Sequence, residues 1–323
     1  MAKRKIYMNG DFVDECDAKV SIFDSSLMFG DMVFEMTRSF NGVHFKLEEH
    51  IDRLFMGLKI LRIDIAESKE DVYNLCLKTA ELNQSAFDDD DEHRLMIDVS
   101  RGVLGIYEGI DGIHQGYNLI IADFPLKWTV KGMAKLYQSG INNVITNQKV
   151  IPSYLMDPKI KNRSRLFYLM ANIEASLFKG ENNWPLMLDT DGYIAEGSGD
   201  NFFIIKDGVV ISPEGRNMLR GISRDYVMNV LCKELGLEVI EKNIEPFDVY
   251  EADEAFICAT PFCMLPVTSL NSLQIGSGKP GKIFCDLIDQ WSKNTKVDII
   301  KQIESWNKIS KIQEGKVTPY KFK

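Results

Sequence analysis

The sequence predicts an α+β protein built from two domains. Its 323 residues exceed the length of an ordinary small domain. Strand-like and helix-like hydrophobic patterns alternate along the chain without an internal repeat, and 45% of the residues are hydrophobic, which is enough for a sizeable core. We expect an N-terminal α/β domain over residues 1–125, a linker over 126–134, a C-terminal α/β domain over 135–290 and a helical extension over 291–323.

The N-terminal part begins with a hairpin signal. Asn9-Gly10 stands between two short strand-like runs, and this dipeptide favours the positive φ angles of a tight turn. Leu54, Leu58 and Leu61 recur at helical spacing and predict a helix over 47–62. The other elements expected in this part are strands over 32–40, 43–45, 95–99 and 119–124 and a helix over 71–82.

The C-terminal part shows the same mixture of strands and helices. Asp191-Gly192 and Asp207-Gly208 predict hairpin turns. The hydrophobic periodicity predicts helices over 162–178 and 223–235 and an amphipathic tail over 298–309 that packs on the body of the protein.

Composition excludes several classes of function. The net charge of −9 is unfavourable for a general nucleic-acid-binding protein. The six cysteines are scattered, as expected for reduced thiols in the cytoplasm, and the four histidines lack the spacing of metal ligands. No run of residues has the length and apolarity of a membrane span. We therefore expect a cytoplasmic protein that uses no metal and binds neither nucleic acid nor membrane.

A lysine and a glutamate stand in settings that suit cofactor chemistry. Lys161 immediately precedes an expected helix, and Glu196 opens a glycine-rich corner before a strand. A lysine amine can form a Schiff base, and an acid can hold a proton on a pyridine nitrogen, which are the two contacts that pyridoxal phosphate needs. Taken alone, both residues also fit a surface lysine and a turn glutamate. Gly197-Ser198-Gly199 is not a dinucleotide fingerprint, because it lacks the third glycine and precedes a strand.

A second glycine stands where the helix over 223–235 is expected to begin. The N–H groups at a helix start have no partner within the helix and point at any anion bound there. Gly221, Ile222 and Ser223 therefore form a candidate phosphate site. An ordinary N-cap role for Ser223 fits the residues equally well.

Four segments, in this order, resemble the class IV pyridoxal-phosphate aminotransferases. They are Lys161 with Glu174-Ala175, Glu196 to Asn201, Leu219 to Asp225, and Thr260. The family includes branched-chain and D-amino-acid aminotransferases and aminodeoxychorismate lyase. The resemblance extends from about Tyr7 to about Phe284 and implies the two-domain fold type IV architecture, a C-terminal cofactor-binding domain, pyridoxal 5'-phosphate as cofactor and a homodimer.

The resemblance also implies roles for individual residues. Lys161 would hold the cofactor as an aldimine and act as the catalytic residue, and Glu196 would contact the ring nitrogen. Leu219 would pack on the ring. The phosphate would be bound by Arg53, Gly221, Ile222, Ser223 and Thr260. Lys159 stands close to Lys161, but counting back from Glu174-Ala175 selects Lys161, and we expect Lys159 to point to solvent.

The segment over 29–38 resembles the family's substrate pocket. The candidate substrate-binding residues are Phe29, Phe34, Met36, Arg38, Arg94, Arg101 and Pro261. An arginine fork suits a carboxylate, whereas Pro261 has no N–H to donate. Because the pocket segment is apolar, we expect a branched-chain or other hydrophobic amino acid as donor and a 2-oxo acid such as 2-oxoglutarate as acceptor.

Three other functions are compatible with the same motifs. The setting of Arg101, Val99-Ser100-Arg101-Gly102, favours a D-amino-acid aminotransferase. A lyase of the aminodeoxychorismate type is disfavoured by Met36, which stands where that enzyme has threonine. A cofactor-binding protein without turnover would not need both Lys161 and Glu196.

Overall fold

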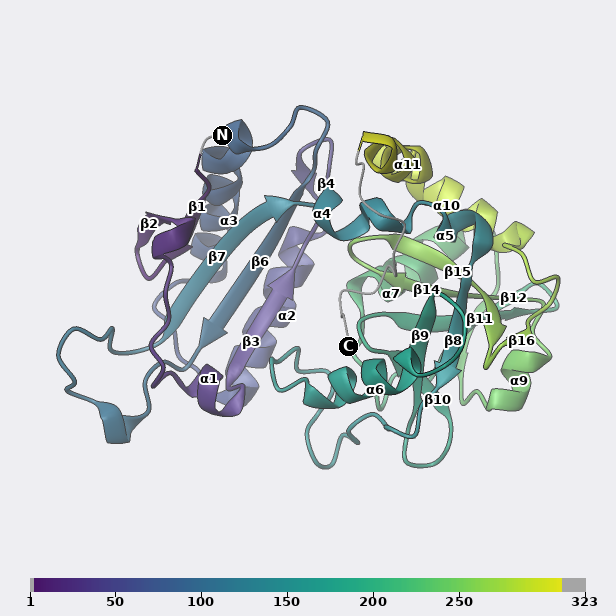
Figure 1. Ribbon diagram of the computed structural model, residues 1–323, viewed down its shortest axis with the longest axis horizontal. Coiled ribbons are helices and arrows are strands. Elements are labelled where there is room, and N and C mark those ends of the chain that lie inside the picture. Colours follow the sequence, from purple (N-terminus) through teal and green to yellow (C-terminus); the bar gives the residue numbers. More distant parts are fainter. Residues whose placement is uncertain (1–2, 310–323) are drawn as a thin grey trace. The chain divides into compact units, whose positions relative to one another are not determined.

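The structure, a computed structural model, describes residues 3–309 in two compact units (Figure 1). The first unit contains the described residues as far as Trp128 together with Ile160–Arg165. The second contains Thr129–Lys159 and the described residues from Leu166 onward. The part of the expected helical extension beyond residue 309 lies outside the described residues.

The first unit is built on an antiparallel sheet with the strand order β2-β1-β7-β6-β3. Its strands are β1 (Lys5–Met8), β2 (Asp11–Asp14), β3 (Met32–Met36), β6 (His93–Ser100) and β7 (Asn118–Pro125), and a separate hairpin joins β4 (Ser39–Phe40) to β5 (Val43–His44). Its helices are α1 (Ser25–Phe29), α2 (Leu47–Leu61) and α3 (Lys69–Asn83). The expected hairpin is confirmed, since Asn9 and Gly10 both have positive φ between β1 and β2.

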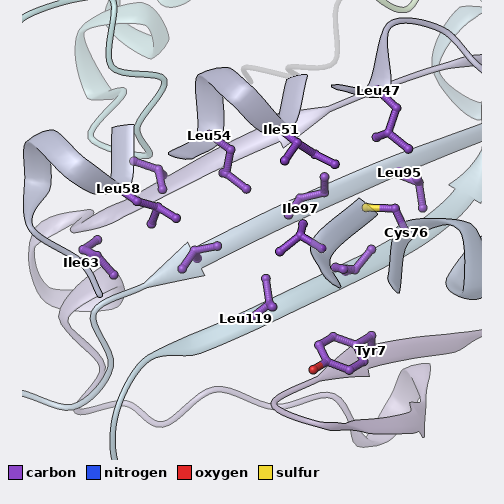
Figure 2. Close-up of a cluster of buried hydrophobic side chains, with 14 of the residues drawn as sticks. Tyr7, Leu47, Ile51, Leu54, Leu58, Ile63, Cys76, Leu95, Ile97 and Leu119 are labelled. Atoms are coloured by element: carbon purple, nitrogen blue, oxygen red, sulfur yellow. The ribbon is translucent and has the colours of Figure 1, made fainter. Parts of the chain in front are cut away.

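Helices α2 and α3 cover one face of this sheet and enclose the core of the unit (Figure 2). Leu54 and Leu58 of α2 lie against alternate residues of β6, among them Leu95 and Ile97. Because neighbouring residues of a strand point to opposite faces, Arg94, Met96 and Asp98 lie on the other face of β6.

Residues 160–165 lie along β3 as an additional edge segment. The Phe34 N–H donates to the Lys161 carbonyl at 2.9 Å, the Arg163 N–H donates to the Met32 carbonyl at 3.0 Å, and Val33 forms a bridge with Asn162. The expected helix over 162–178 therefore begins later, as α6 (Leu166–Ser176). The start at 162 was wrong because these residues spend their backbone groups on pairing with β3.

The second unit contains strands that close on themselves. The order is β10-β9-β8-β15-β14-β11-β12-β13, and β10 pairs with β11 as well as with β9. The strands are β8 (Ile141–Ile145), β9 (Asn183–Leu188), β10 (Ile194–Gly197), β11 (Asn201–Lys206), β12 (Val209–Pro213), β13 (Val239–Lys242), β14 (Glu254–Ala259), β15 (Cys263–Leu270) and β16 (Leu273–Gln274). Closure brings the β10–β11 turn, which carries the glycine-rich motif, next to the middle of the sheet.

The second unit has two groups of helical segments besides α6. One is a helical run over 222–234, made of α7 (Ile222–Tyr226), a π-helical turn (Val227–Leu231) and α8 (Cys232–Glu234), close to the expected 223–235. The others are α4 (Lys127–Val130), α5 (Leu136–Ser139), α9 (Pro246–Tyr250), α10 (Lys282–Thr295) and α11 (Ile299–Ile309). Ile299, Ile303 and Trp306 of α11 are buried, so the amphipathic tail packs as predicted.

Candidate functional site

Lys161 lies on the face of the first unit's sheet that α2 and α3 leave uncovered. Ile160 enters the hydrophobic core, so the alternation of an extended segment directs its neighbour Lys161 the other way. The Lys161 Nζ atom stands 4.8 Å from the centre of the Phe34 ring. Both residues are among those predicted for the site, and β3 pairing brings them together.

Two further cations share this ring. The guanidinium of Arg163 stacks on Phe34 at 3.8 Å and donates two hydrogen bonds to Asp98, at 2.9 and 2.7 Å, and Arg165 lies 5.4 Å from the ring. Burial raises the pKa of Asp98, and Arg163 opposes that shift. The Lys161 face is therefore strongly cationic, which suits an anionic ligand. Sequence patterns gave no sign of Asp98, because its partner lies far along the chain.

A buried carboxylate on the other side of β3 holds Arg53. Glu35 accepts hydrogen bonds from Arg53 Nε at 2.6 Å and Nη2 at 2.8 Å, and from His50 Nδ1 at 2.7 Å. Burial alone raises the pKa of Glu35, but Arg53 and His50 outweigh it and hold that pKa well below its usual value. Burial lowers the pKa of His50, so a neutral imidazole donates its Nδ1–H to Glu35. Arg53 is thus fixed in one orientation on α2.

Arg94 is a buried guanidinium that pairs with no carboxylate among the described residues. Its Nη2 contacts the sulfur of Met36 at 3.7 Å, its Nε has no hydrogen-bond partner, and its guanidinium lies 5.7 Å from the Phe124 ring. Burial and the neighbouring Arg38 lower the pKa of Arg94 to about 10. Arg38 is itself buried and stacks on Phe40 at 3.8 Å. An unpaired buried guanidinium is costly and indicates a place for an anion.

Two of the predicted substrate residues lie elsewhere in the first unit. Arg101 pairs with Asp31 at 2.6 Å and donates to the carbonyls of Leu61 and Arg62, where α2 ends. Phe29, on α1, is 66% exposed. Neither approaches Arg94 through a described contact.

Lys159 does not point freely to solvent, contrary to our expectation. Its ammonium donates to Asp157 at 2.8 Å and to the Arg216 carbonyl at 3.1 Å, and its side chain is 30% exposed. The partner carbonyl lies too far along the chain for a local pattern to reveal it. Lys159 and Lys161 also fall in different units.

In the second unit, Glu196 is buried and accepts two well-placed donors. The Tyr168 hydroxyl donates to Glu196 Oε1 at 2.6 Å, and the Leu219 N–H donates to Oε2 at 3.1 Å. These bonds hold the carboxylate at the end of β10 beside the predicted ring-packing residue Leu219. Tyr168 was missed in the sequence, where a tyrosine within a helix has no distinguishing feature.

Asn201 fixes the loop that follows β12. Its Nδ2 donates to the Leu219 carbonyl at 2.9 Å. A Cβ atom at position 221 would stand 2.1 Å from Asn201 Oδ1, so only glycine fits there. Asn201 and Gly221 together bring the Leu219 N–H to Glu196.

Gly221 is the N-cap of the helical run, and no side chain caps that end. The alternative of an N-cap role for Ser223 is therefore wrong. Ile222 and Ser223 instead occupy the first turn, where backbone N–H groups are open to an anion, and Ser223 is buried. Thr260 and Pro261 form the turn between β14 and β15, with Thr260 half-buried.

The residues fit pyridoxal phosphate within each unit. The second unit offers a buried, hydrogen-bonded carboxylate for a ring N–H and a glycine-led helix start for a phosphate. The first offers the Lys161 amine and the fixed Arg53 fork. Among the described helices, none is long and apolar enough to cross a membrane.

Comparison with known proteins gives the family. The sequence model of the family "Amino-transferase class IV" matches residues 32–270. The putative branched-chain-amino-acid aminotransferase of Methanocaldococcus jannaschii is 36% identical over 295 residues, covering 89% of this chain and 97% of that protein.

Two solved structures share the fold. The branched-chain amino acid aminotransferase of Escherichia coli has a TM-score of 0.79 at 27% identity and covers 90% of this chain and 94% of its own. A thermophile-type relative, the T.th. branched-chain amino acid aminotransferase with pyridoxamine 5'-phosphate, has a TM-score of 0.80 at 25% identity and covers 95% and 98%. The predicted fold and enzyme class are confirmed, and the chain belongs to the class IV aminotransferase family.

Proposed function

We propose that this enzyme uses pyridoxal 5'-phosphate to move the amino group of a branched-chain or other hydrophobic amino acid to a 2-oxo acid such as 2-oxoglutarate. The observation that carries the proposal is the buried Glu196 carboxylate, held by Tyr168 and Leu219 beside a helix start that no side chain caps. The relatives' names support the choice of substrate.

In this proposal each predicted residue has a defined task. Glu196 accepts a hydrogen bond from the ring nitrogen, and Leu219 packs on the ring. Arg53, Ser223, Thr260 and the N–H groups of Gly221 and Ile222 bind the phosphate. When bound, the cofactor supplies an electron sink for the carbanion formed at the substrate Cα. The Lys161 amine attaches the cofactor and, once displaced, carries the proton that leaves Cα.

The surroundings of Arg94 support a dicarboxylic acceptor. The distal carboxylate of 2-oxoglutarate would satisfy the guanidinium that Met36 contacts only through sulfur. Phe34 and Met36 lie on the same face of β3 and would contact an apolar side chain. Arg38, Arg101, Phe29 and Pro261 stay candidates for substrate contacts.

The visible spectrum of the purified protein tests the proposal. We expect an absorbance band from the covalently bound cofactor that Lys161→Ala abolishes and Lys159→Ala retains. L-Leucine or L-valine should bleach the band, and 2-oxoglutarate should restore it. Bleaching by D-alanine or D-glutamate alone would favour the D-amino-acid aminotransferase, and a band that no amino acid bleaches would favour a lyase. Absence of a band with added cofactor would overturn the proposal.

Arg94→Met tests the acceptor. Loss of a charge-assisted hydrogen bond of about 1.5–3 kcal/mol should raise KM for 2-oxoglutarate about 10- to 100-fold. KM for 4-methyl-2-oxopentanoate, which has no second carboxylate, should change little. Arg101→Met is the matched control, and an equal effect of both substitutions on 2-oxoglutarate would contradict the assignment.

We further propose a homodimer in the cytoplasm. The segment around α1 exposes Ile22, Leu27, Met28 and Phe29, a concentration of large apolar side chains that a second copy of the chain would cover. The six free cysteines fit a reducing compartment. Light scattering should give twice the chain mass for the wild type and the mass of one chain for Leu27→Glu; a wild-type monomer would contradict the dimer.

A further inference from the structure

The turn between β10 and β11 contains an acid that the proposed mechanism does not use. Asp200 closes this turn by accepting the Gly197 N–H on its backbone carbonyl at 3.0 Å. Glu196 and Asn201, on either side of the turn, are paired across the two strands. Asp200 is thus held by the same hairpin that positions Glu196.

The side chain of Asp200 is buried and incompletely paired. It is 8% exposed, and its Oδ1 atom has no hydrogen-bond partner. The carboxyl group folds back over Gly197, since a Cβ there would stand 2.2 Å from Oδ1. The absence of a side chain at Gly197 therefore makes room for this carboxyl group directly beside Glu196.

No cation among the described residues pairs with Asp200. Arg224 is the basic residue nearest in the electrostatics of this region, but it donates to the Ser212 hydroxyl at 2.8 Å and the Pro213 carbonyl at 3.1 Å and pairs with Glu241 at 3.2 Å. The Cys258 thiol on β14 is also close, and burial raises its pKa. Burial and the neighbouring Glu196 raise the pKa of Asp200 to about 8, while the Gly199 N–H opposes the shift.

The two carboxyl groups differ in the donors they receive. Glu196 accepts the Tyr168 O–H and the Leu219 N–H, which stabilise its charged form. Asp200 receives the backbone N–H of Gly199 and has an unsatisfied oxygen. When two adjacent carboxyl groups share one charge, the charge stays on the better-solvated member and the proton on the other.

We propose that Asp200 is a positioning residue of the cofactor site, a neutral carboxylic acid that leaves the negative charge of the pair on Glu196. Its action on the cofactor rests on the proposed function, because Glu196 is the group that would face the ring nitrogen. At neutral pH the ring then meets a single negative charge, and a second appears when Asp200 loses its proton at higher pH.

Infrared difference spectroscopy of the cofactor-free protein tests the protonation directly. At pH 6.5 the wild type should show the C=O stretch of a buried carboxylic acid, and Asp200→Asn should remove it. Asp189→Asn is the matched control, since Asp189 is also buried but accepts the N–H groups of Asp191 and Tyr193 at 2.9 and 3.0 Å and Asn217 Nδ2 at 3.3 Å. A wild-type spectrum without that stretch, or one unchanged in Asp200→Asn, would overturn the proposal.

A pH titration of the bound cofactor's visible band tests the effect on the site. The charge that Asp200 gains above about pH 8 favours protonated forms of the cofactor. The band should therefore change at lower pH in Asp200→Asn than in the wild type, and Asp200→Glu should restore the wild-type midpoint. Equal midpoints in all three proteins would contradict the positioning role. Failure of the wild type to bind cofactor would refute the proposed function, while the infrared result would still decide the protonation.

Discussion

Glu35 and Asp200 are buried carboxyl groups, one in each unit, and their surroundings drive them to opposite charge states. Glu35 receives the Arg53 fork and His50, and its pKa lies well below the usual value. Asp200 has no cation within the described structure and an unpartnered oxygen, and its pKa rises to about 8. Burial opposes the charge in both, so the partners decide the outcome.

The comparison also separates two ways of preparing a cofactor site. In the first unit, a charged acid fixes a basic residue, because Glu35 orients Arg53. In the second, a neutral acid leaves its neighbour Glu196 as the charged member of the pair.

The largest expected effect comes from removing the charge of Glu35. Glu35→Gln leaves Arg53 without its buried counter-charge, and we expect a loss of roughly 3 kcal/mol in the free energy of unfolding. Urea denaturation measures it. Glu49→Gln, which breaks the exposed pair with Lys46, should cost below about 1 kcal/mol. Similar losses in the two variants would mean that the Glu35 cluster is no stronger than a surface pair.

The same carboxylate should make stability depend on acid pH. Its folded-state pKa is depressed, so its stabilisation is present above the unfolded-state pKa of about 4.3 and is lost as the pH falls toward the folded value. The difference in unfolding free energy between wild type and Glu35→Gln should shrink below pH 4.3, by at most about 1.4 kcal/mol per pH unit. Urea midpoints from pH 6 to 3 measure this, and a constant difference would show that Glu35 titrates normally.

The hydrogen bond between Tyr168 and Glu196 is next in size. Tyr168→Phe removes a donor to a buried carboxylate and should cost about 2 kcal/mol in unfolding free energy. It should also shift the acid–base midpoint of the bound cofactor's band, because Glu196 loses a donor that stabilises its charge. Phe167→Leu is the neighbouring control, and an equal loss in both would attribute the effect to packing.

Two glycines of the second unit provide the smallest and most closely matched test. Gly221→Ala places a Cβ against Asn201, whose amide is held by Leu219, and should cost about 1–2 kcal/mol. Gly199→Ala meets no atom within 4 Å and should leave stability within about 0.5 kcal/mol of the wild type. Thermal unfolding of both variants measures the difference, which should vanish if the Asn201 contact does not hold the loop.

Local features were predictable where neighbouring residues decide them. Asn9-Gly10 forms its turn because both residues tolerate positive φ, and Leu54 and Leu58 place α2 because helical spacing gathers them on one face. The order of motifs around Lys161 and Glu196 was enough to predict the family and its fold.

Features that depend on distant partners required the tertiary structure. The helix after Lys161 begins at Leu166 because β3 claims the backbone of residues 161–163, and Lys159 is held by a carbonyl at Arg216. The donors to Glu196 come from α6 and the loop after β12, and the charge of Asp200 depends on which groups surround it when it is buried. The sequence by itself determined which chemical groups the chain carries and the local conformations that short-range sterics impose. Tertiary structure decided their partners, and so their charge, because desolvation and hydrogen bonding act only once distant segments pack together.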